Sequence, residues 1–120
     1  MKKMVFIVDD SDTNLLTARE ILHKEFSVMT IPSGEKLFKI LNKLIPDLIL
    51  LDIEMPGMNG FEVLEKLKSD KALSSIPVIF LTGLQSTNVE IKGMEMGAID
   101  FIYKPFCSLS FLNRIKAHLQ

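Results

Sequence analysis

The chain has a single cysteine and no long apolar run, and both absences limit what it can be. Cys107 has no partner for an internal disulfide, and only two histidines accompany it, so no Cys/His metal cluster is present. The apolar stretch 4–8 ends at Asp9 and is too short for a signal-peptide core. No later run approaches the ~18 residues of a membrane span. We therefore expect a cytoplasmic, reduced protein without a membrane segment.

An excess of charge of one sign is lacking as well. Fourteen Lys and Arg residues stand against fifteen Asp and Glu, and no run of five basic residues occurs. We therefore expect neither direct nucleic-acid binding nor attachment to a membrane surface. With 120 residues, of which 48% are hydrophobic, the chain can bury one core but has no room for a second domain of ordinary size. We expect one domain over residues 1–120.

Five short apolar runs rich in β-branched residues predict five strands. The first, third and fourth runs do not alternate between apolar and polar residues, which is typical of strands covered on both faces. Such strands belong to a parallel, central sheet. The five runs are residues 4–8, 27–31, 47–51, 77–81 and 99–103.

The segments between and after these runs have the spacing of amphipathic helices. Residues 13–24 carry one apolar face, whereas residues 86–96 contain Gly93 and have a weaker pattern. Four of the five segments show clear apolar faces, formed by Leu15, Ala18 and Leu22, then Leu37, Ile40, Leu41 and Leu44, then Phe61, Leu64 and Leu67, and finally Leu109, Leu112, Ile115 and Leu119.

Capping residues precede three of these helices. Ser11 or Asp12 precedes the first and Ser33 the second, while Asn59 and Glu62 form a capping-box pattern at the third. Strand and helix thus alternate five times, and right-handed crossovers then place helices on both faces of the sheet. The predicted fold is α/β: a doubly wound five-stranded parallel sheet of order 2-1-3-4-5 with five helices, a flavodoxin-like three-layer sandwich.

Polar residues follow four of the predicted strands. In a doubly wound sheet, ligands bind beyond the carboxyl ends of the strands, so these residues are the candidates for function. They are Asp9 and Asp10 after the first strand, Asp52 after the third, Thr82 and Gly83 after the fourth, and Lys104 with Pro105 after the fifth.

Three carboxylates gathered at one edge would repel one another unless protons or a cation offset their charge. Mg²⁺ suits such a site, because it keeps several waters and takes only one or two carboxylates with a phosphate oxygen. Asp52 could also act as a base or nucleophile. We expect Glu54 at the rim, with its carbonyl within reach of the metal and its side chain in solvent. A purely structural role of Asp9 and Asp10 beside a helix N-terminus is the alternative.

Lys104 and Thr82 could bind the oxygens of a phosphoryl group, one through an ammonium and the other through a hydroxyl. Gly83 leaves open space beside Thr82, and Pro105 is the residue type before which a cis peptide bond occurs. We interpret Met94 and Met96 as packing residues.

Five motifs occur here in the order in which one known family carries them: Asp9-Asp10, Asp52, the loop 55–60, Thr82-Gly83 and Lys104-Pro105. On these motifs, which span essentially the whole chain, it resembles the receiver domain of two-component response regulators, similar to the chemotaxis type. Two positions depart from the family pattern. Asn59 stands where many members have Asp, and Phe101 lacks the hydroxyl of a Tyr. We expect neither change to affect the phosphorylation chemistry.

The resemblance implies that Asp52 accepts a phosphoryl group from a phosphohistidine on a sensor histidine kinase or a phosphotransfer protein. Mg²⁺, with Mn²⁺ as an alternative ion, would be held by Asp10, Asp52 and the Glu54 main-chain carbonyl, and by Asp9 through water. Lys104 and Thr82 would hold phosphoryl oxygens. Such a domain catalyses its own phosphorylation and dephosphorylation and is not a turnover enzyme on a separate substrate.

The resemblance further implies a switch. Phe101 would change rotamer when Thr82 moves toward the phosphoryl group, and this would alter the face formed by the fourth helix, fifth strand and fifth helix. That face would control an output domain or an effector protein, and a homodimer formed on phosphorylation is left open.

Three other readings compete with this one. A metal-dependent phosphatase would carry its Asp nucleophile after the first strand in an Asp-x-Asp pattern, whereas Asp52-Ile53-Glu54 follows the third. A flavin or nucleotide module would need a glycine-rich phosphate loop where this chain is acidic. A degenerate receiver acting as a phosphorylation-independent docking module would not need the complete set of site residues.

Overall fold

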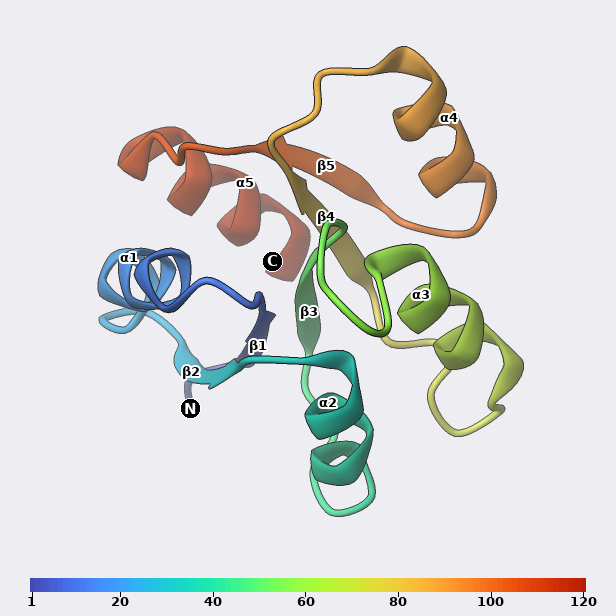
Figure 1. Cartoon of the computed structure of the whole chain (residues 1–120). Coiled ribbons are helices and arrows are strands. Elements are labelled where there is room, and N and C mark those ends of the chain that lie inside the picture. Colours follow the sequence, from blue (N-terminus) through green and yellow to red (C-terminus); the bar gives the residue numbers. More distant parts are fainter.

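A parallel five-stranded sheet forms the middle layer of the molecule. The computed structural model describes all residues, 1–120. The strands lie in the order β2-β1-β3-β4-β5 and every neighbouring pair is parallel, so the predicted order is confirmed (Figure 1). The strands are β1 (Met4–Val8), β2 (Ser27–Ile31), β3 (Leu48–Asp52), β4 (Val78–Thr82) and β5 (Asp100–Tyr103).

Helices cover both faces of this sheet. In Figure 1, α1 and α5 lie on one side, and α2, α3 and α4 lie on the other. None of the five helices combines the length and the hydrophobicity needed to cross a bilayer. The helices are α1 (Asp12–Leu22), α2 (Gly34–Leu41), α3 (Gly60–Ser69), α4 (Thr87–Glu95) and α5 (Ser108–Leu119).

The two-sided cover explains why the central strands are apolar without alternation. Successive side chains of β1 enter opposite cores: Val5 and Ile7 pack with the side chains of α1 and α5, whereas Phe6 and Val8 pack with those of α2 and α3. Every residue of β3 and β4 is buried. The strands at the centre of the sheet are therefore a rigid base for the residues at their carboxyl ends.

Two strands extend one residue further than their apolar runs. Asp52 pairs with Leu81, and Thr82 pairs with Tyr103, so both polar residues still belong to the sheet. The predicted strands began one residue too early, at positions 47 and 77, and stopped before these two residues. The hydrogen-bonded ladder continues past the point at which hydrophobicity ends, and it holds the Asp52 and Thr82 backbones in place.

The predicted helix caps are confirmed. The side chains of Ser11 and Ser33 accept hydrogen bonds from the first turns of α1 and α2. Asn59 and Glu62 form a complete capping box at α3, with both reciprocal bonds 3.0 Å long. Helix α2 ends at Leu41, so Leu44 lies beyond it, although Leu44 still packs against the core.

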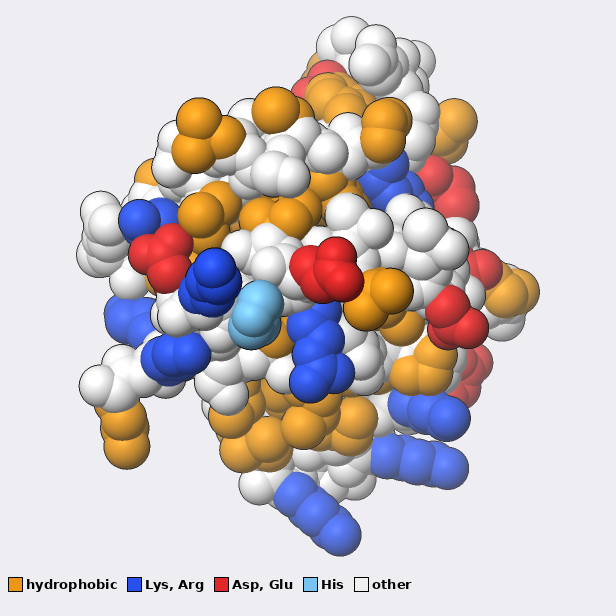
Figure 2. Space-filling model, turned by 90° about the vertical axis from the view of Figure 1, so that its left-hand side faces the viewer, with side chains coloured by type: hydrophobic (Ala, Val, Ile, Leu, Met, Phe, Trp, Pro, Cys, Tyr) orange, Lys and Arg blue, Asp and Glu red, His pale blue; other side chains and the backbone are white.

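The predicted apolar face of the last helix was wrong in part. Helix α5 buries Phe111, Ile115 and Leu119, whereas 69% of Leu109 is exposed. Leu109 instead lies beside a shallow groove of about 500 Å³ between α1 and α5, which Ile21 also lines. Figure 2 views the molecule from the side of these two helices and shows apolar side chains there among charged ones.

The methionines of α4 and its C-cap differ in their surroundings. Met96 packs against the core as predicted, but 49% of Met94 is exposed, so the interpretation of Met94 as a packing residue was wrong. Helix α4 buries only Gly93, and its other residues are exposed or half-buried. The weak periodicity of this segment thus reflects a helix that barely enters the core.

Gly60 joins α3 to the end of β3 at very close range. A Cβ atom at this position would lie 2.6 Å from the Asp52 carbonyl oxygen and 2.8 Å from the Ile53 Cα atom. These neighbours are backbone atoms that cannot turn aside. Gly83 is the opposite case, because a Cβ atom there would meet nothing within 4 Å.

We expect Gly60→Ala to lower the free energy of unfolding by about 1–3 kcal/mol, because the helix must shift away from β3 to relieve the overlap. Gly83→Ala should change it by no more than about 0.5 kcal/mol. Urea denaturation of the two variants and the parent protein measures both effects. Equal stability of the two variants would contradict this account of Gly60.

Candidate functional site

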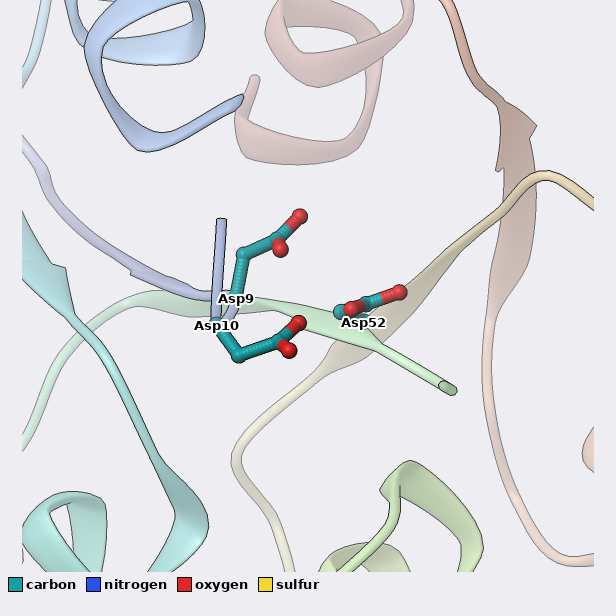
Figure 3. Close-up of side chains that lie close together, drawn as sticks. All are labelled: Asp9, Asp10 and Asp52. Atoms are coloured by element: carbon teal, nitrogen blue, oxygen red, sulfur yellow. The ribbon is translucent and has the colours of Figure 1, made fainter. Parts of the chain in front are cut away.

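Three carboxylates meet at the carboxyl edge of the sheet. Asp9 and Asp10 follow β1, and Asp52 is the last residue of the adjacent strand β3. Each of the three offers one oxygen, and these oxygens lie within 4.8 Å of one another. Figure 3 shows the side chains of Asp9 and Asp10 extending from the end of β1 on the side where Asp52 lies. The structure thus brings together the acids that the sequence separates by more than forty positions.

Lys104 is the cation of this cluster. Its Nζ atom lies 3.0 Å from Asp52 Oδ1 and 3.5 Å from Asp9 Oδ2. The side chains of both aspartates are 1% exposed, and that of Lys104 is 18% exposed. The Lys104-Pro105 peptide bond is cis, and the Lys104 backbone amide donates a hydrogen bond to the Thr82 carbonyl. The β5 end therefore delivers the ammonium group to the carboxylates.

Asp9 and Asp10 differ in what surrounds them. Asp9 accepts hydrogen bonds from the Ser11 backbone amide at 2.9 Å and from Asn14 Nδ2 at 3.3 Å, in addition to the contact with Lys104. Both of its oxygens are engaged. Asp10 is exposed. This difference supports the expectation that Asp10 binds a metal directly and Asp9 through water. Asn14 was missed in the sequence, where its position in the first turn of a helix marks it only as a polar surface residue.

Burial raises the pKa of the Asp52 carboxyl from its ordinary value of 3.8 to about 7. The hydrogen bond and charge of Lys104 oppose this rise, whereas the charges of Asp9 and Glu54 add to it. Burial also disfavours the charged form of Lys104, but the hydrogen bond and charge of Asp52, with those of Asp9, outweigh it and raise the lysine pKa. The ammonium thus stays charged while Asp52 is poised to gain or lose a proton near neutral pH.

The donor set fits a hard divalent cation. Mg²⁺ prefers oxygen ligands and retains waters, and the cluster presents three carboxylates of which one is exposed. A cation among them would offset their repulsion and favour the ionised form of Asp52. The cysteine and both histidines lie outside this cluster, so it offers only oxygen ligands, which suit hard cations such as Mg²⁺ or Mn²⁺ better than Zn²⁺.

Thr82 lies at the end of β4 and is fully buried. Its hydroxyl donates to the Glu54 carboxylate, with Oγ1 at 3.0 Å from Oε2 and 3.3 Å from Oε1, and accepts from the Leu84 backbone amide at 3.0 Å. Gly83 donates its backbone amide to Glu54 Oε1 at 3.3 Å. The expectation that the Glu54 side chain is directed into solvent was therefore wrong in part: the residue is exposed, but its carboxylate bonds to Thr82 and Gly83.

Phe101 lies in the core with 4% of its surface exposed. Its ring packs 5.4 Å from that of Phe80, measured between centroids, and sits under α4. A Cβ atom on Gly93 would lie 2.5 Å from the Phe101 ring, so the glycine makes room for the buried ring. Gly93, which only weakened the helix pattern in the sequence, is thus the residue that allows Phe101 to occupy this position.

Comparison with known proteins agrees with the fold. The family model of the response regulator receiver domain matches residues 5–116. A protein of Vibrio cholerae named as a probable cyclic di-GMP phosphodiesterase is 38% identical over 116 residues, which are 97% of this chain and 26% of that protein. Response regulator PleD of Caulobacter vibrioides is 35% identical over 118 residues, covering 98% and 26%. The chain spans about a quarter of the length of these two relatives.

A solved structure shows the same fold over nearly the whole chain. Chemotaxis protein CheY4 of Vibrio cholerae superposes with a TM-score of 0.91 at 25% identity, covering 98% of each chain.

Asp10→Asn provides a test of the cation site. Removing one charge from the cluster should raise the unfolding free energy of metal-free protein by about 1 kcal/mol at low ionic strength. The same change should diminish the stabilisation by Mg²⁺, which reaches about 2.7 kcal/mol for a bound ligand at a hundredfold excess over its Kd. Thermal denaturation in chelator and in MgCl₂ measures both quantities.

Asp12→Asn is the matched control, because Asp12 is an exposed acid in the first turn of α1 and is not a member of the cluster. It should retain the full stabilisation by Mg²⁺. If Asp10→Asn also retained it, Asp10 would not be a ligand.

Proposed function

Because the chain belongs to the response regulator receiver family, we propose that it is a phosphorylation-dependent switch whose phosphoacceptor is Asp52. The phosphoryl donor is a phosphohistidine on a sensor histidine kinase or a phosphotransfer protein. The observation that carries this proposal is the side-chain environment of Asp52: nearly fully buried, bound by Lys104 and beside two further carboxylates. Residues 1–120 then make up one receiver domain.

In the proposed reaction, an Asp52 carboxylate oxygen attacks the phosphorus atom in line with the bond to the donor nitrogen. The new P–O bond forms as the P–N bond breaks, and the imidazole nitrogen keeps the bonding electron pair. Lys104, which lies 3.0 Å from Asp52, is placed to bind a phosphoryl oxygen, and the Thr82 hydroxyl and Gly83 amide are at the next strand end. These groups stabilise the charge of the transferring group.

The metal would be held by Asp10, Asp52 and the Glu54 main-chain carbonyl, with Asp9 acting through water. When bound, Mg²⁺ neutralises charge on the carboxylates and on the phosphoryl oxygens. The domain is a self-modifying phosphoacceptor and not a turnover enzyme, because its own Asp52 carries the phosphoryl group until water removes it.

The proposed output face comprises α4, β5 and α5. On this face, Ile91 and Met94 of α4 and Ile99 before β5 are 50%, 49% and 37% exposed, so apolar side chains are available to a partner. Asp100 accepts hydrogen bonds from Arg114 Nε at 3.2 Å and pairs with His118 at 3.0 Å, which links β5 to α5. Movement of Thr82 and Phe101 beneath this face would change what it binds.

The partner of this face is an output domain or an effector protein. The Vibrio and Caulobacter relatives are about four times as long as this chain, and one is named as a probable cyclic di-GMP phosphodiesterase, so an enzymatic output is one such partner. A homodimer through the same face on phosphorylation remains part of the proposal. We place the switch in the cytoplasm, in accord with the single free cysteine of the chain.

The complete set of phosphorylation residues does not favour a degenerate receiver. Asp9, Asp10, Asp52, Thr82 and Lys104 all converge at one edge of the sheet, although a docking module would need none of them there.

Intact-mass spectrometry after incubation with acetyl phosphate tests the proposal. We expect one phosphoryl adduct in the parent protein in MgCl₂, no adduct in chelator, and no adduct in Asp52→Asn, because the amide lacks the nucleophilic oxygen anion. Asp12→Asn should form the adduct as the parent does. An adduct of equal yield in Asp52→Asn would show that another residue is the acceptor.

A further inference from the structure

The Glu54 side chain is hydrogen-bonded to the two groups that are proposed to bind the phosphoryl group. Its two carboxylate oxygens accept hydrogen bonds from the Thr82 hydroxyl at 3.0 and 3.3 Å and from the Gly83 amide at 3.3 Å. These are the two donors that the end of β4 offers to the cleft. Sequence reasoning used only the main-chain carbonyl of Glu54 and left its carboxylate without a role.

A carboxylate resembles a phosphoryl group in the feature that these donors recognise. Both groups have anionic oxygens that accept hydrogen bonds from an O–H and an N–H group. The Thr82 hydroxyl carries a single proton, and its oxygen already accepts the Leu84 amide at 3.0 Å. Thr82 therefore cannot donate to Glu54 and to a phosphoryl oxygen at the same time.

We propose that Glu54 is an internal stand-in for the phosphoryl group, and that its carboxylate must leave Thr82 and Gly83 before they can bind phosphorylated Asp52. This inference rests on the proposed function of Asp52. It adds a residue that sets the rate of phosphorylation without touching the donor: a positioning residue that acts through Thr82.

The exposure of Glu54 makes such an exchange feasible. The residue lies at the rim of the cleft and is exposed, so its carboxylate can turn into water and regain hydration when the hydrogen bonds break. Thr82, in contrast, is fully buried and belongs to the β4–β5 ladder. The exchange therefore begins with movement of Glu54.

The stand-in also affects the switch. With Glu54 bound, the Thr82 hydroxyl is already turned toward the cleft, and the Phe101 ring is buried beneath Gly93. Glu54 thus holds the Thr82 hydroxyl in the resting protein, and Thr82 can move toward the phosphoryl group only after this bond has broken. Phosphorylation then exchanges one anionic acceptor of Thr82 for another.

The first test reads the contact directly and needs no phosphoryl transfer. Amide ¹H–¹⁵N spectra of metal-free protein should show the Gly83 proton resonance moving upfield in Glu54→Ala, because the amide loses an anionic acceptor. Glu65→Ala removes the same charge from an exposed position on α3 and should leave the Gly83 resonance in place. An unchanged Gly83 resonance in Glu54→Ala would overturn the inference.

The second test measures the rate of phosphorylation of Asp52 by acetyl phosphate in MgCl₂. Release of Thr82 should make Glu54→Ala react faster than the parent protein by about fivefold, whereas Glu65→Ala should react at the parent rate. The Thr82→Ala background separates competition from general repulsion. The acceleration should shrink there if Glu54 acts by occupying Thr82, and an acceleration of the same size in both backgrounds would overturn the inference.

The two tests fail independently. If no variant with Asp52 intact acquires a phosphoryl group, the proposed function is wrong, and the Gly83 resonance still decides whether Glu54 occupies the β4 donors.

Discussion

Two buried carboxylates, those of Asp9 and Asp52, meet the Lys104 ammonium group at the edge of the sheet beside the exposed Asp10, and the rest of the site depends on this arrangement. Asp9 and Asp52 are almost fully buried, and Lys104 lies 3.0 Å from one and 3.5 Å from the other. Burial, together with the charges of Asp9 and Glu54, raises the pKa of Asp52 to about 7 against the opposing effect of Lys104. The cluster is thereby set up to gain positive charge, either from a divalent cation or from protons.

The fold keeps this unfavourable cluster in place. The central strands are buried on both faces, and the ladder continues through Asp52 and Thr82, so neither backbone can retreat from the cleft. The close approach at Gly60 fixes the start of α3 against the end of β3. The stability of the sheet therefore keeps the carboxylates close together despite their electrostatic repulsion. Binding of a cation can relieve this repulsion.

Thr82 links this chemistry to the surface of the molecule. Its hydroxyl is a single donor for which Glu54 and a phosphoryl oxygen compete. Strand β4 pairs with β5, which contains Phe101 and is followed directly by Lys104. The Phe101 ring in turn fills the space that Gly93 leaves under α4. The β4–β5 pairing and the Phe101 ring thus connect Thr82 to α4, whose apolar residues are exposed.

The fold and most of the site were predictable because they follow from repeated local patterns. Non-alternating apolar runs indicate strands covered on both faces. The polar residues at the ends of the predicted strands are Asp9, Asp10, Asp52, Thr82 and Lys104. Once the strand order is known, their convergence follows. Hydrophobicity could not locate the ends of β3 and β4, since a hydrogen-bonded ladder includes polar residues as readily as apolar ones.

Other features depended on contacts between residues far apart in the chain. The Glu54 carboxylate binds Thr82, twenty-eight positions away, and nothing beside Glu54 in the sequence distinguishes a rim acid from a bound one. Glycine is a poor helix former, and the reason for Gly93 in α4 is the Phe101 ring, which packs where a side chain at this position would lie. The sequence alone determined which groups reach the cleft, because strand ends are local. The tertiary structure decided which of those groups bind one another, because that depends on the spacing of strands and the direction of each side chain.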